Sequence, residues 1–346
     1  MAQEETTLAE MTLAGDDAVV PFHVEPLDAR GRAVQLGPML DSILDRHDYP
    51  EPVARLLAEM IVLTVLLGTS LKFDGKFISQ TQTDGAVDLL VVDFTTPSSV
   101  RAYARFDEEK LARAIEANAT TPEALLGAGI LALTVDQGEY TQRYQGIVEL
   151  NGSSMEEVAE SYFRQSEQIP TTVKLAVARI AQRGEDGFKE SWRAGGMVVQ
   201  FLPDSPDRMR MPDLPGGDGP EDADVEDTVE FDDTWLETRA LVDTVDASEL
   251  TDPKVGVERL LYRLFHERGV SVFPSNPVAD DCSCSRERIR SVLESFSREE
   301  FAESIEDGKV EVTCEFCSTE YVFSPDEFEP SAAADTDETG QGGSHA

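Results

Sequence analysis

Hydrophobic and polar positions alternate in short runs along the chain up to residue 202. These alternating or β-rich runs lie at 76–82, 87–95, 100–106, 130–135, 140–150 and 196–202. The first two are separated by Thr83-Asp84-Gly85-Ala86, a turn sequence typical of a β-hairpin. Short connections between consecutive strands favour antiparallel pairing. We therefore predict an antiparallel sheet in the N-terminal part of the chain.

Helical patterns interrupt these strands at two places. The most apolar stretch, 53–67, contains Arg55 and Glu59 and is too short to cross a bilayer, so we predict a buried core helix. Ser154 and Glu157 form a capping box before a second helix. One face of that helix carries Met155, Val158, Ala159, Tyr162 and Phe163, and Pro170 follows its end. Residues 19–202 are thus expected to form an α+β core domain.

The pattern changes abruptly after this domain. Residues 203–233 contain five prolines and twelve acidic residues but few large apolar side chains. Such a segment cannot bury enough surface to offset its ordering entropy, and we expect it to be disordered. We expect the same of the tail, 325–346, and a flexible N-terminus over 1–18.

A helical segment follows at 234–279. Thr234 and Glu237 are predicted to cap its first helix, while Asp252 and Pro253 start the second and Gly269 closes it. The second helix carries an apolar stripe that must be covered by another part of the protein. The stripe consists of Val257, Leu260, Leu261, Leu264 and Phe265.

All four cysteines of the chain lie in one short region near its C-terminus. Their spacing is C-x-C, twenty-nine intervening residues, then C-x-x-C, formed by Cys282, Cys284, Cys314 and Cys317. Four sulfurs satisfy the tetrahedral preference of zinc without histidine or carboxylate. Between the pairs we predict a helix capped by Ser285, a second helix after the capping box of Ser297 and Glu300, and a hairpin of 310–312 with 321–323.

A small zinc-binding domain over 280–324 is therefore expected, and its zinc can be purely structural or part of a switch. Each cysteine pair is close enough in sequence to form its own disulfide. Zinc holds sulfurs as thiolates, the form that peroxide attacks. Oxidation would remove the metal that helps fold the domain.

Charge and composition exclude several classes of function. A formal charge of −39, from 68 acidic and 29 basic residues, opposes binding to nucleic acid or to an anionic membrane. The N-terminus, MAQEETTLAEMTLAGDD, lacks the basic start and apolar core of a secretory signal, so we expect a cytoplasmic protein. In that compartment, clustered cysteines favour metal or redox chemistry.

Catalytic patterns are weak. The histidines, at His23, His47, His266 and His345, do not fall at ligand spacing, and no Ser-His-Asp pattern stands out, so we do not expect an enzyme. Gly195-Gly196 lacks the Lys-Ser or Lys-Thr of a phosphate loop and predicts a tight turn into a strand.

Several segments resemble a known family. LLYRLFHERGVSVF, CSCSRERI and VEVTCEFCSTEYVF are similar to the C-terminal half of the redox-regulated heat-shock holdase known as the 33 kDa chaperonin. LLGTSLKFDGKFISQTQ, YQGIVEL, SYFRQSEQIP and AGGMVVQ resemble its core-domain motifs. The chain departs from the family in the acidic segment after Leu202, in Asp280-Asp281 before the first cysteine, and in its polar tail.

The resemblance implies a chaperone that is inactive when reduced and zinc-bound and active when oxidised. Cys282, Cys284, Cys314 and Cys317 would bind zinc, and under oxidative stress Cys282 would pair with Cys284 and Cys314 with Cys317. The oxidised form would be a homodimer that holds unfolding client proteins without ATP. We expect the stripe from Val257 to Phe265 to be covered in the reduced state, by the core or by the zinc domain, and exposed to clients after oxidation.

Two alternatives remain open. A thiol-disulfide oxidoreductase would place its C-x-x-C at a strand-to-helix turn, whereas Cys314 and Cys317 are predicted to lie between two strands. A nucleic-acid-binding zinc ribbon would need a larger basic patch than Arg286, Arg288 and Arg290 provide.

Overall fold

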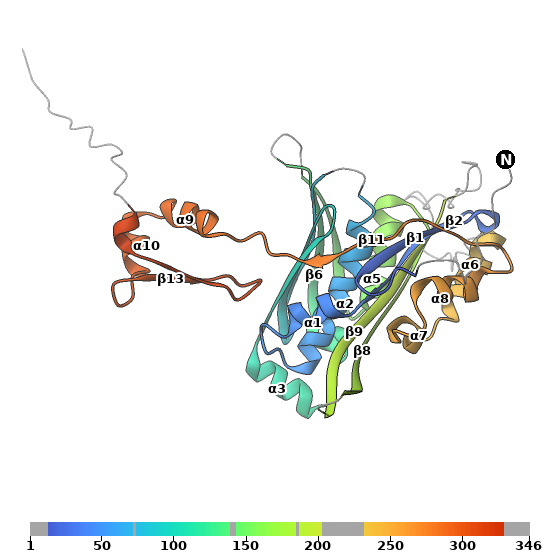
Figure 1. Ribbon diagram of the computed structural model, residues 1–346, viewed down its shortest axis with the longest axis horizontal. Helices are drawn as coiled ribbons and strands as arrows, with labels where there is room; N and C mark the ends of the chain where they lie inside the picture. The colour runs from blue at the N-terminus through green and yellow to red at the C-terminus, as the bar shows by residue number, and fades with distance from the viewer. Residues whose placement is uncertain (1–12, 72–73, 139–142, 185–186, 203–231, 329–346) are drawn as a thin grey trace, which may run out of the picture. The chain divides into compact units, whose positions relative to one another are not determined.

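The computed structural model describes residues 13–71, 74–138, 143–184, 187–202 and 232–328. Three segments predicted to be flexible or disordered therefore lie wholly or mostly outside the described residues, at 1–12, 203–231 and 329–346. The chain divides into two compact units, one ending at Cys282 and one beginning at Ser283. Each unit is described by itself (Figure 1).

The first unit contains two sheets and confirms the predicted α+β class. The first sheet has the order β10-β1-β2-β9-β8, with β11 also paired to β1. Its strands are β1 (Ala18–Val24), β2 (Ala29–Leu36), β8 (Thr171–Gly184), β9 (Gly187–Phe201), β10 (Ser271–Val272) and β11 (Asn276–Pro277). The second sheet has the order β12-β5-β4-β3-β6-β7. Its strands are β3 (Lys76–Thr83), β4 (Val87–Thr95), β5 (Ser99–Phe106), β6 (Ala128–Asp136), β7 (Tyr144–Asn151) and β12 (Ala279–Asp280).

Strand pairing follows the prediction where the sequence alternates clearly. β3 and β4 form the expected antiparallel hairpin, and among the described strands only β12 pairs in parallel, with β5. The sequence pattern did not predict strands β1, β2 and β8. β1 contains Pro21, and β2 contains Gly31 between two arginines, so neither shows a clean alternation.

Helix α2 (Glu51–Gly68) is the predicted buried core helix. It packs between the two sheets and is buried around most of its circumference because it has a sheet on either side (Figure 1). No helix in the described part of the chain combines the length and apolar character that a membrane crossing requires. The other helices before the acidic segment are α1 (Pro38–Leu44), α3 (Glu108–Glu116), α4 (Pro122–Leu126) and α5 (Met155–Tyr162).

Helix α5 begins with the predicted capping box of Ser154 and Glu157. Its two acidic side chains one turn apart, Glu156 and Glu160, accept hydrogen bonds from the backbone N–H groups of Leu175 (2.7 Å) and Val173 (3.0 Å). Those N–H groups lie on the outer edge of β8, the last strand of its sheet. An exposed strand edge invites pairing with other chains, and the two carboxylates satisfy part of it.

Helix α2 carries a carboxylate, Glu59, that makes folding sensitive to pH. Burial, and secondarily the charge of Glu156, raises the pKa of Glu59 to about 7. The folded state then holds a proton between pH 4.5 and 7 that the unfolded state releases, so stability should fall as pH rises through this window. Glu59→Gln should remove that loss and stabilise the protein at pH 8 by about 2–3 kcal/mol.

Urea unfolding at pH 5.5 and pH 8 measures this effect. Fluorescence of Trp192 and Trp235, both buried in the first unit, reports the transition. The matched control, Glu116→Gln on the exposed end of α3, should leave the pH dependence unchanged. Equal pH dependence in the wild-type chain and Glu59→Gln would contradict this assignment.

Three helices after the acidic segment complete the first unit: α6 (Asp233–Asp243), α7 (Ala247–Thr251) and α8 (Val257–Phe265). Two sequence predictions about them are wrong. The cap of α6 is Asp232, since Glu237 turns away to pair with Arg268 at 2.6 Å. Asp252 and Pro253 do not start a helix; they lie between α7 and α8, because α7 has its own capping box from Asp246 and Glu249.

The second unit matches its predicted elements closely. It contains α9 (Arg286–Glu294), capped by Ser285, and α10 (Arg298–Glu303), which begins with the capping box of Ser297 and Glu300. β13 (Val310–Thr313) and β14 (Glu320–Phe323) form the antiparallel hairpin. The small core is buried at Leu293, Val310 and Phe323. Order continues past residue 325, contrary to prediction, because Phe328 packs on Phe301 and Phe323 after a 3-10 turn at Pro325–Glu327.

Candidate metal and redox centre

The four cysteines meet at one point although twenty-nine residues separate the two pairs. The Sγ atoms of Cys282, Cys284, Cys314 and Cys317 all lie within 4.8 Å of one another. The sulfurs of Cys284 and Cys317 are 3.3 Å apart. Cys314 is buried, and the other three cysteines are partly buried.

Local secondary structure positions each of the two cysteine pairs. Cys284 directly precedes Ser285, whose hydroxyl accepts a hydrogen bond from the N–H of Arg288 and so starts α9. Cys314 and Cys317 lie in the turn between β13 and β14, where the N–H of Cys314 donates to the carbonyl of Thr319 (2.9 Å). The first pair therefore sits at a helix N-terminus, where partial positive charge favours thiolates.

Arg286 fixes α9 against the hairpin. Its guanidinium donates to the carbonyl oxygen of Val322 (2.8 Å), pairs with Glu327 (3.0 Å) and lies 4.2 Å from the ring centre of Phe323. This set of contacts holds the start of α9, and with it Cys284, beside β14.

Hydrogen bonds around the sulfurs stabilise their ionised form. Burial raises the pKa of Cys317, but hydrogen bonds with Thr319, Cys284 and Cys314 outweigh it and lower the pKa to about 6. The hydroxyl of Tyr321 donates to Sγ of Cys284 (3.2 Å), and this bond raises the pKa of Tyr321 to about 12. Cys317 therefore favours the thiolate form near neutral pH.

The donor set fits a soft, tetrahedral metal ion. Four thiolates at about 2.3 Å from a zinc ion would lie about 3.8 Å from one another. Sulfurs that already lie within 4.8 Å need only small movements to reach that arrangement. Tyr321 supplies the kind of outer hydrogen bond that orients metal ligands.

Replacing Tyr321 by Phe should therefore weaken zinc binding about tenfold, since outer hydrogen-bond partners of metal ligands typically contribute that much. Competition with a chromophoric chelator measures the affinity. Cys284→Ser, which removes a sulfur, should lose far more. The control is Tyr262→Phe, because Tyr262 is half-exposed on α8 and far in sequence from the cysteines. Unchanged affinity in Tyr321→Phe would show that this hydroxyl does not support the site.

The surroundings of the cysteines bear on both alternative functions. Cys314 and Cys317 lie between two strands, not at the strand-to-helix turn of a thiol-disulfide oxidoreductase. The arginines of α9 are engaged by protein groups. Arg286 pairs with Glu327, Arg290 with Glu294, and Arg288 donates to the carbonyl of Ser283. They do not form an open basic patch for nucleic acid.

The histidines do not assemble a site. His23 lies on β1, His47 follows α1 and His266 ends α8, while His345 lies outside the described residues.

The segment before the cysteines is fastened to the core. β10 and β11 pair with β1, and β12 pairs with β5. The unusual acidic pair contributes directly, because Asp280 accepts from Ser42 (2.7 Å) and pairs with Arg46, and Asp281 accepts from Ser99 (2.8 Å). Residues 271–281 thus form a strap from α8 to the first cysteine.

The predicted apolar stripe is completely buried. Val257, Leu260, Leu261, Leu264 and Phe265 pack against the outer face of the first sheet. Their partners there include Val20, Phe22, Met197 and Val199, and the rings of Phe22 and Phe265 stack with centres 5.8 Å apart. The core sheet provides this cover.

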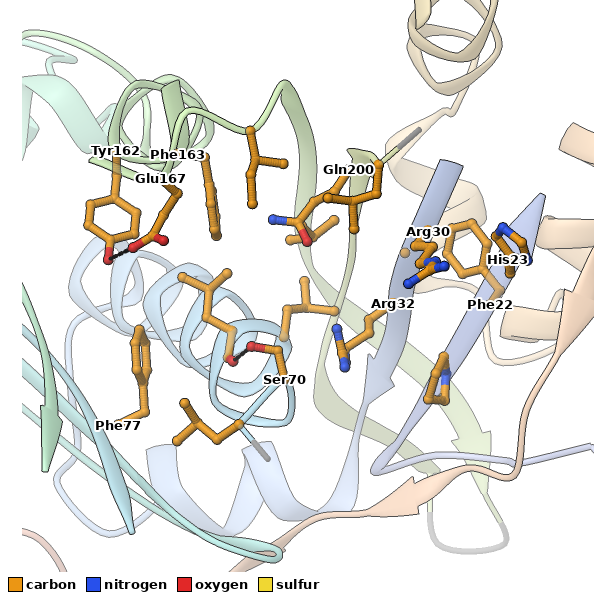
Figure 2. Close-up of a pocket in the computed structure, with 18 of the residues that line it drawn as sticks. Phe22, His23, Arg30, Arg32, Ser70, Phe77, Tyr162, Phe163, Glu167 and Gln200 are labelled. Atoms are coloured by element: carbon orange, nitrogen blue, oxygen red, sulfur yellow. Dashed lines mark hydrogen bonds between the residues drawn. The ribbon is translucent and has the colours of Figure 1, made fainter. Parts of the chain in front are cut away.

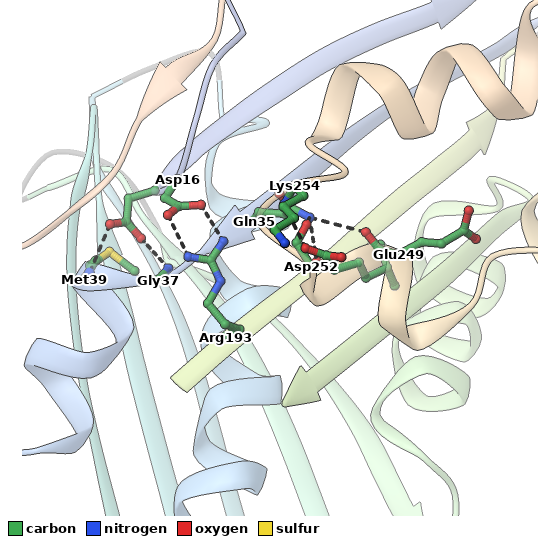
Figure 3. A network of polar contacts seen from close by, with 10 residues as sticks. Asp16, Gln35, Gly37, Met39, Arg193, Glu249, Asp252 and Lys254 are labelled. Carbon is green, nitrogen blue, oxygen red and sulfur yellow. Dashed lines mark hydrogen bonds and ion pairs between the residues drawn. The ribbon is translucent and has the colours of Figure 1, made fainter. Parts of the chain in front are cut away.

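Polar contacts dock α7 on the same face (Figure 3). Nε2 of the buried Gln35 lies 3.1–3.3 Å from the carbonyl oxygens of Glu249, Leu250 and Asp252. Gly195 lies inside β9, so the predicted turn at Gly195-Gly196 is wrong. A Cβ atom at Gly195 would collide with the carbonyl oxygen of Leu250, so glycine is needed for close approach of α7.

Sequence reasoning missed Gln35, Gly195 and Tyr321. The partners of Gln35 and Gly195 lie more than fifty residues away, and Tyr321 meets a cysteine thirty-seven residues before it. Only the out-of-place Gly195-Gly196 pair in a β-rich run gave a signal, since glycine inside a strand often marks a close backbone approach.

The fold and the site define a class: an α+β protein with a helical cover on one sheet, followed by a small unit built around four clustered thiols. The family model described as "Hsp33 protein" matches residues 17–324. The chain belongs to the Hsp33 family.

Curated relatives agree over nearly the whole length. A "33 kDa chaperonin" from Caulobacter vibrioides is 43% identical over 92% of this chain and 99% of its own length. One from Proteus mirabilis is 33% identical over 90% of this chain and 94% of its own. The crystal structure of the 33 kDa chaperonin from Thermotoga maritima shares the fold, with a TM-score of 0.65 and 19% identity over 90% of this chain and 96% of that one.

Proposed function

We propose that this protein is a cytoplasmic, redox-regulated chaperone that holds unfolding proteins without ATP. It is inactive when reduced and zinc-bound, and oxidation activates it. The observation that carries the proposal is the pairing of two features in one chain: four thiols gathered within 4.8 Å and an apolar stripe on α8 that is buried against the first sheet.

Cys282, Cys284, Cys314 and Cys317 are the proposed zinc ligands. Bound zinc supplies a cross-link that holds the two ends of the second unit together. The chain supplies thiolates stabilised by hydrogen bonds at Cys284 and Cys317, and these are the nucleophiles that react with hydrogen peroxide.

Oxidation converts each pair of thiols into a disulfide. Two thiols lose two electrons and two protons, and one hydrogen peroxide molecule becomes two water molecules. The proposed pairs, by resemblance to the family, are Cys282 with Cys284 and Cys314 with Cys317. Disulfide sulfurs are poor zinc ligands, so the second unit loses its cross-link.

Peptide mapping of the peroxide-treated chain should therefore find two local disulfides, each within one short peptide. Local pairing leaves α9 and the hairpin unconnected, which the proposed unfolding requires. Zinc measured on the same sample should fall below about one tenth of the reduced value, because both ligand pairs are consumed. Predominant links between the pairs, such as Cys282 to Cys317, would contradict local pairing.

Unfolding of the second unit releases one end of the strap. The short pairings of β10, β11 and β12, the contacts of Asp280 and Asp281, and the buried side chain of Val278 then hold that end on the core. We propose that the strap and then α6–α8 loosen, exposing the stripe and the face of the first sheet to clients. Large exposed apolar surface also favours self-association, and the oxidised form is proposed to be a homodimer.

Aggregation suppression tests the whole proposal. A chemically unfolded protein is diluted into buffer with the reduced, zinc-loaded chain or with the peroxide-treated chain, without ATP. The oxidised chain should suppress light scattering at near-stoichiometric amounts, and the reduced chain should not. Equal activity of the two forms would refute redox control, and inactivity of both would refute the chaperone assignment.

A further inference from the structure

A cavity of about 810 Å³ lies in the first unit, and neither the cysteines nor the residues of the stripe on α8 are among those that line it. It opens between the end of α2, strands β1, β2 and β9, and the π-helical turn after α5 (Figure 2). Its volume falls within the range of small-molecule pockets, about 300–1,000 Å³.

One wall of this cavity is apolar. It is formed by the C-terminal turn of α2 and by side chains from β3 and the turn after α5. The residues are Leu66, Leu67, Leu71, Phe77, Phe163 and Ile169. A wall of this kind accommodates a hydrocarbon body.

The opposite wall carries positive charge. Arg32 extends from β2 into the cavity, with Arg30 and His23 beside it (Figure 2). Burial lowers the pKa of Arg32, and its Nε atom is buried without a hydrogen-bond partner. Among the described residues, neither Arg30 nor Arg32 forms an ion pair with a protein carboxylate.

A partly buried arginine without a carboxylate partner is unusual in this chain. With 68 acidic side chains available, three other buried or partly buried arginines are paired, Arg193 with Asp16, Arg101 with Asp93 and Arg46 with Asp280. A partly buried guanidinium without an anion pays a desolvation cost that a bound anion would offset. Arginine is also suited to bind a carboxylate through two parallel hydrogen bonds.

The far end of the cavity sets the orientation of a ligand. Glu167 lies there and accepts a hydrogen bond from the hydroxyl of Tyr162 at 3.0 Å (Figure 2). Its negative charge would repel an anionic group, so the anion belongs at Arg32 and the apolar body extends toward Phe163.

We propose that this cavity binds a monocarboxylate with an unbranched hydrocarbon chain, its carboxylate at Arg32 and its chain against the wall of Leu71 and Phe163. The site is independent of the cysteine chemistry. A protein that acts under oxidative stress and contains this cavity would sense or carry free medium-chain carboxylates.

Calorimetric titration of the reduced full-length chain with decanoate, below its micelle concentration, tests the proposal. The reduced form keeps the stripe on α8 covered, so it does not compete for the probe. One decanoate should bind per chain, at least about tenfold tighter than decanol, because a charge-assisted hydrogen bond contributes that much. Binding of many molecules per chain, or equal binding of decanol, would overturn the proposal.

Two charge-matched variants locate the carboxylate. Arg32→Gln should weaken decanoate binding about tenfold or more. Arg164→Gln makes the same charge change on the exposed turn beside the cavity, without lining it, and should bind like the wild-type chain. Equal losses in the two variants would reduce the effect to the overall charge of the protein and overturn the assignment of Arg32.

A labelling experiment on the wild-type chain gives an answer even if Arg32→Gln folds poorly. Decanoate with a photoreactive diazirine near its terminal carbon should label peptides containing Leu66–Leu71 and Phe163–Ile169, and excess decanoate should block the labelling. Labels spread over other surfaces, or labels that decanoate does not block, would show non-specific adsorption and refute the site.

Discussion

Removing zinc from the reduced chain with a chelator should unfold the second unit, residues 283–328, while α2 and the two sheets around it in the first unit keep their structure. Among the described residues of the second unit, the apolar core is fully buried at Leu293, Val310 and Phe323, whereas Val292 on α9 and Phe296 just after it are substantially exposed. A domain of this size cannot bury enough apolar surface to fold alone. A four-thiolate zinc site contributes on the order of 10 kcal/mol of folding free energy.

Amide hydrogen exchange followed by mass spectrometry measures this result. Amides of α9 and of the β13–β14 hairpin should lose protection by on the order of 10³ or more after chelation. Amides of α2 serve as the internal control, because that helix lies in the core of the first unit. Adding zinc back under reducing conditions should restore protection.

Protected α9 amides in a chain shown by metal analysis to lack zinc would contradict the prediction. The second unit would then fold by packing alone, and oxidation would have to activate the protein by another route.

Replacing Leu261 by Glu should make the reduced, zinc-loaded chain active as a holdase. Leu261 is fully buried against the first sheet. Placing a carboxylate there costs several kcal/mol, roughly 3–5, whether the charge is buried or the contact is lost. A cover that oxidation can release must be only marginally stable, so this cost is enough to open it. We expect at least about half of the aggregation suppression shown by the oxidised wild-type chain.

The matched control lies one residue away on the same helix. Tyr262 is 51% exposed, so Tyr262→Glu adds the same charge to α8 without entering the buried contact. It should remain inactive until oxidised. Zinc content and exchange protection of the second unit should be normal in both variants, which separates opening of the cover from loss of metal.

An inactive Leu261→Glu chain, with zinc bound and normal activation by peroxide, would show that the stripe on α8 is not the gate. The client surface would then lie elsewhere in the first unit, and the strap or the second unit itself would control access to it.

Short stretches of sequence determine much of the local structure. The capping boxes at Ser154 and Ser297, the cap at Ser285, the β3–β4 hairpin and the buried α2 were all predicted correctly. Each depends on groups within one or two turns of each other. The clustering of the cysteines, too, follows from residue type and spacing, since few arrangements other than a metal site need four thiols in so short a segment.

In two of the wrong predictions, the deciding partner is distant in the chain. Gly195-Gly196 indicated a turn, but the carbonyl of Leu250, packed against β9, requires glycine inside a strand. Thr234 and Glu237 had the spacing of a capping box, but Arg268, thirty-one residues away, draws Glu237 into an ion pair. Local chemistry allowed both outcomes, and tertiary contacts selected one.

The sequence by itself determined the α+β class, the four-cysteine cluster and an apolar stripe on α8 that needs a cover. Only the tertiary structure decided what covers that stripe, which hydroxyl meets Cys284, and that Arg32 faces a cavity without a carboxylate partner among the described residues. The physical reason is the distance along the chain over which each kind of interaction acts. Backbone propensity and side-chain spacing act over a few residues, whereas burial and pairing depend on which surfaces the folded chain brings together.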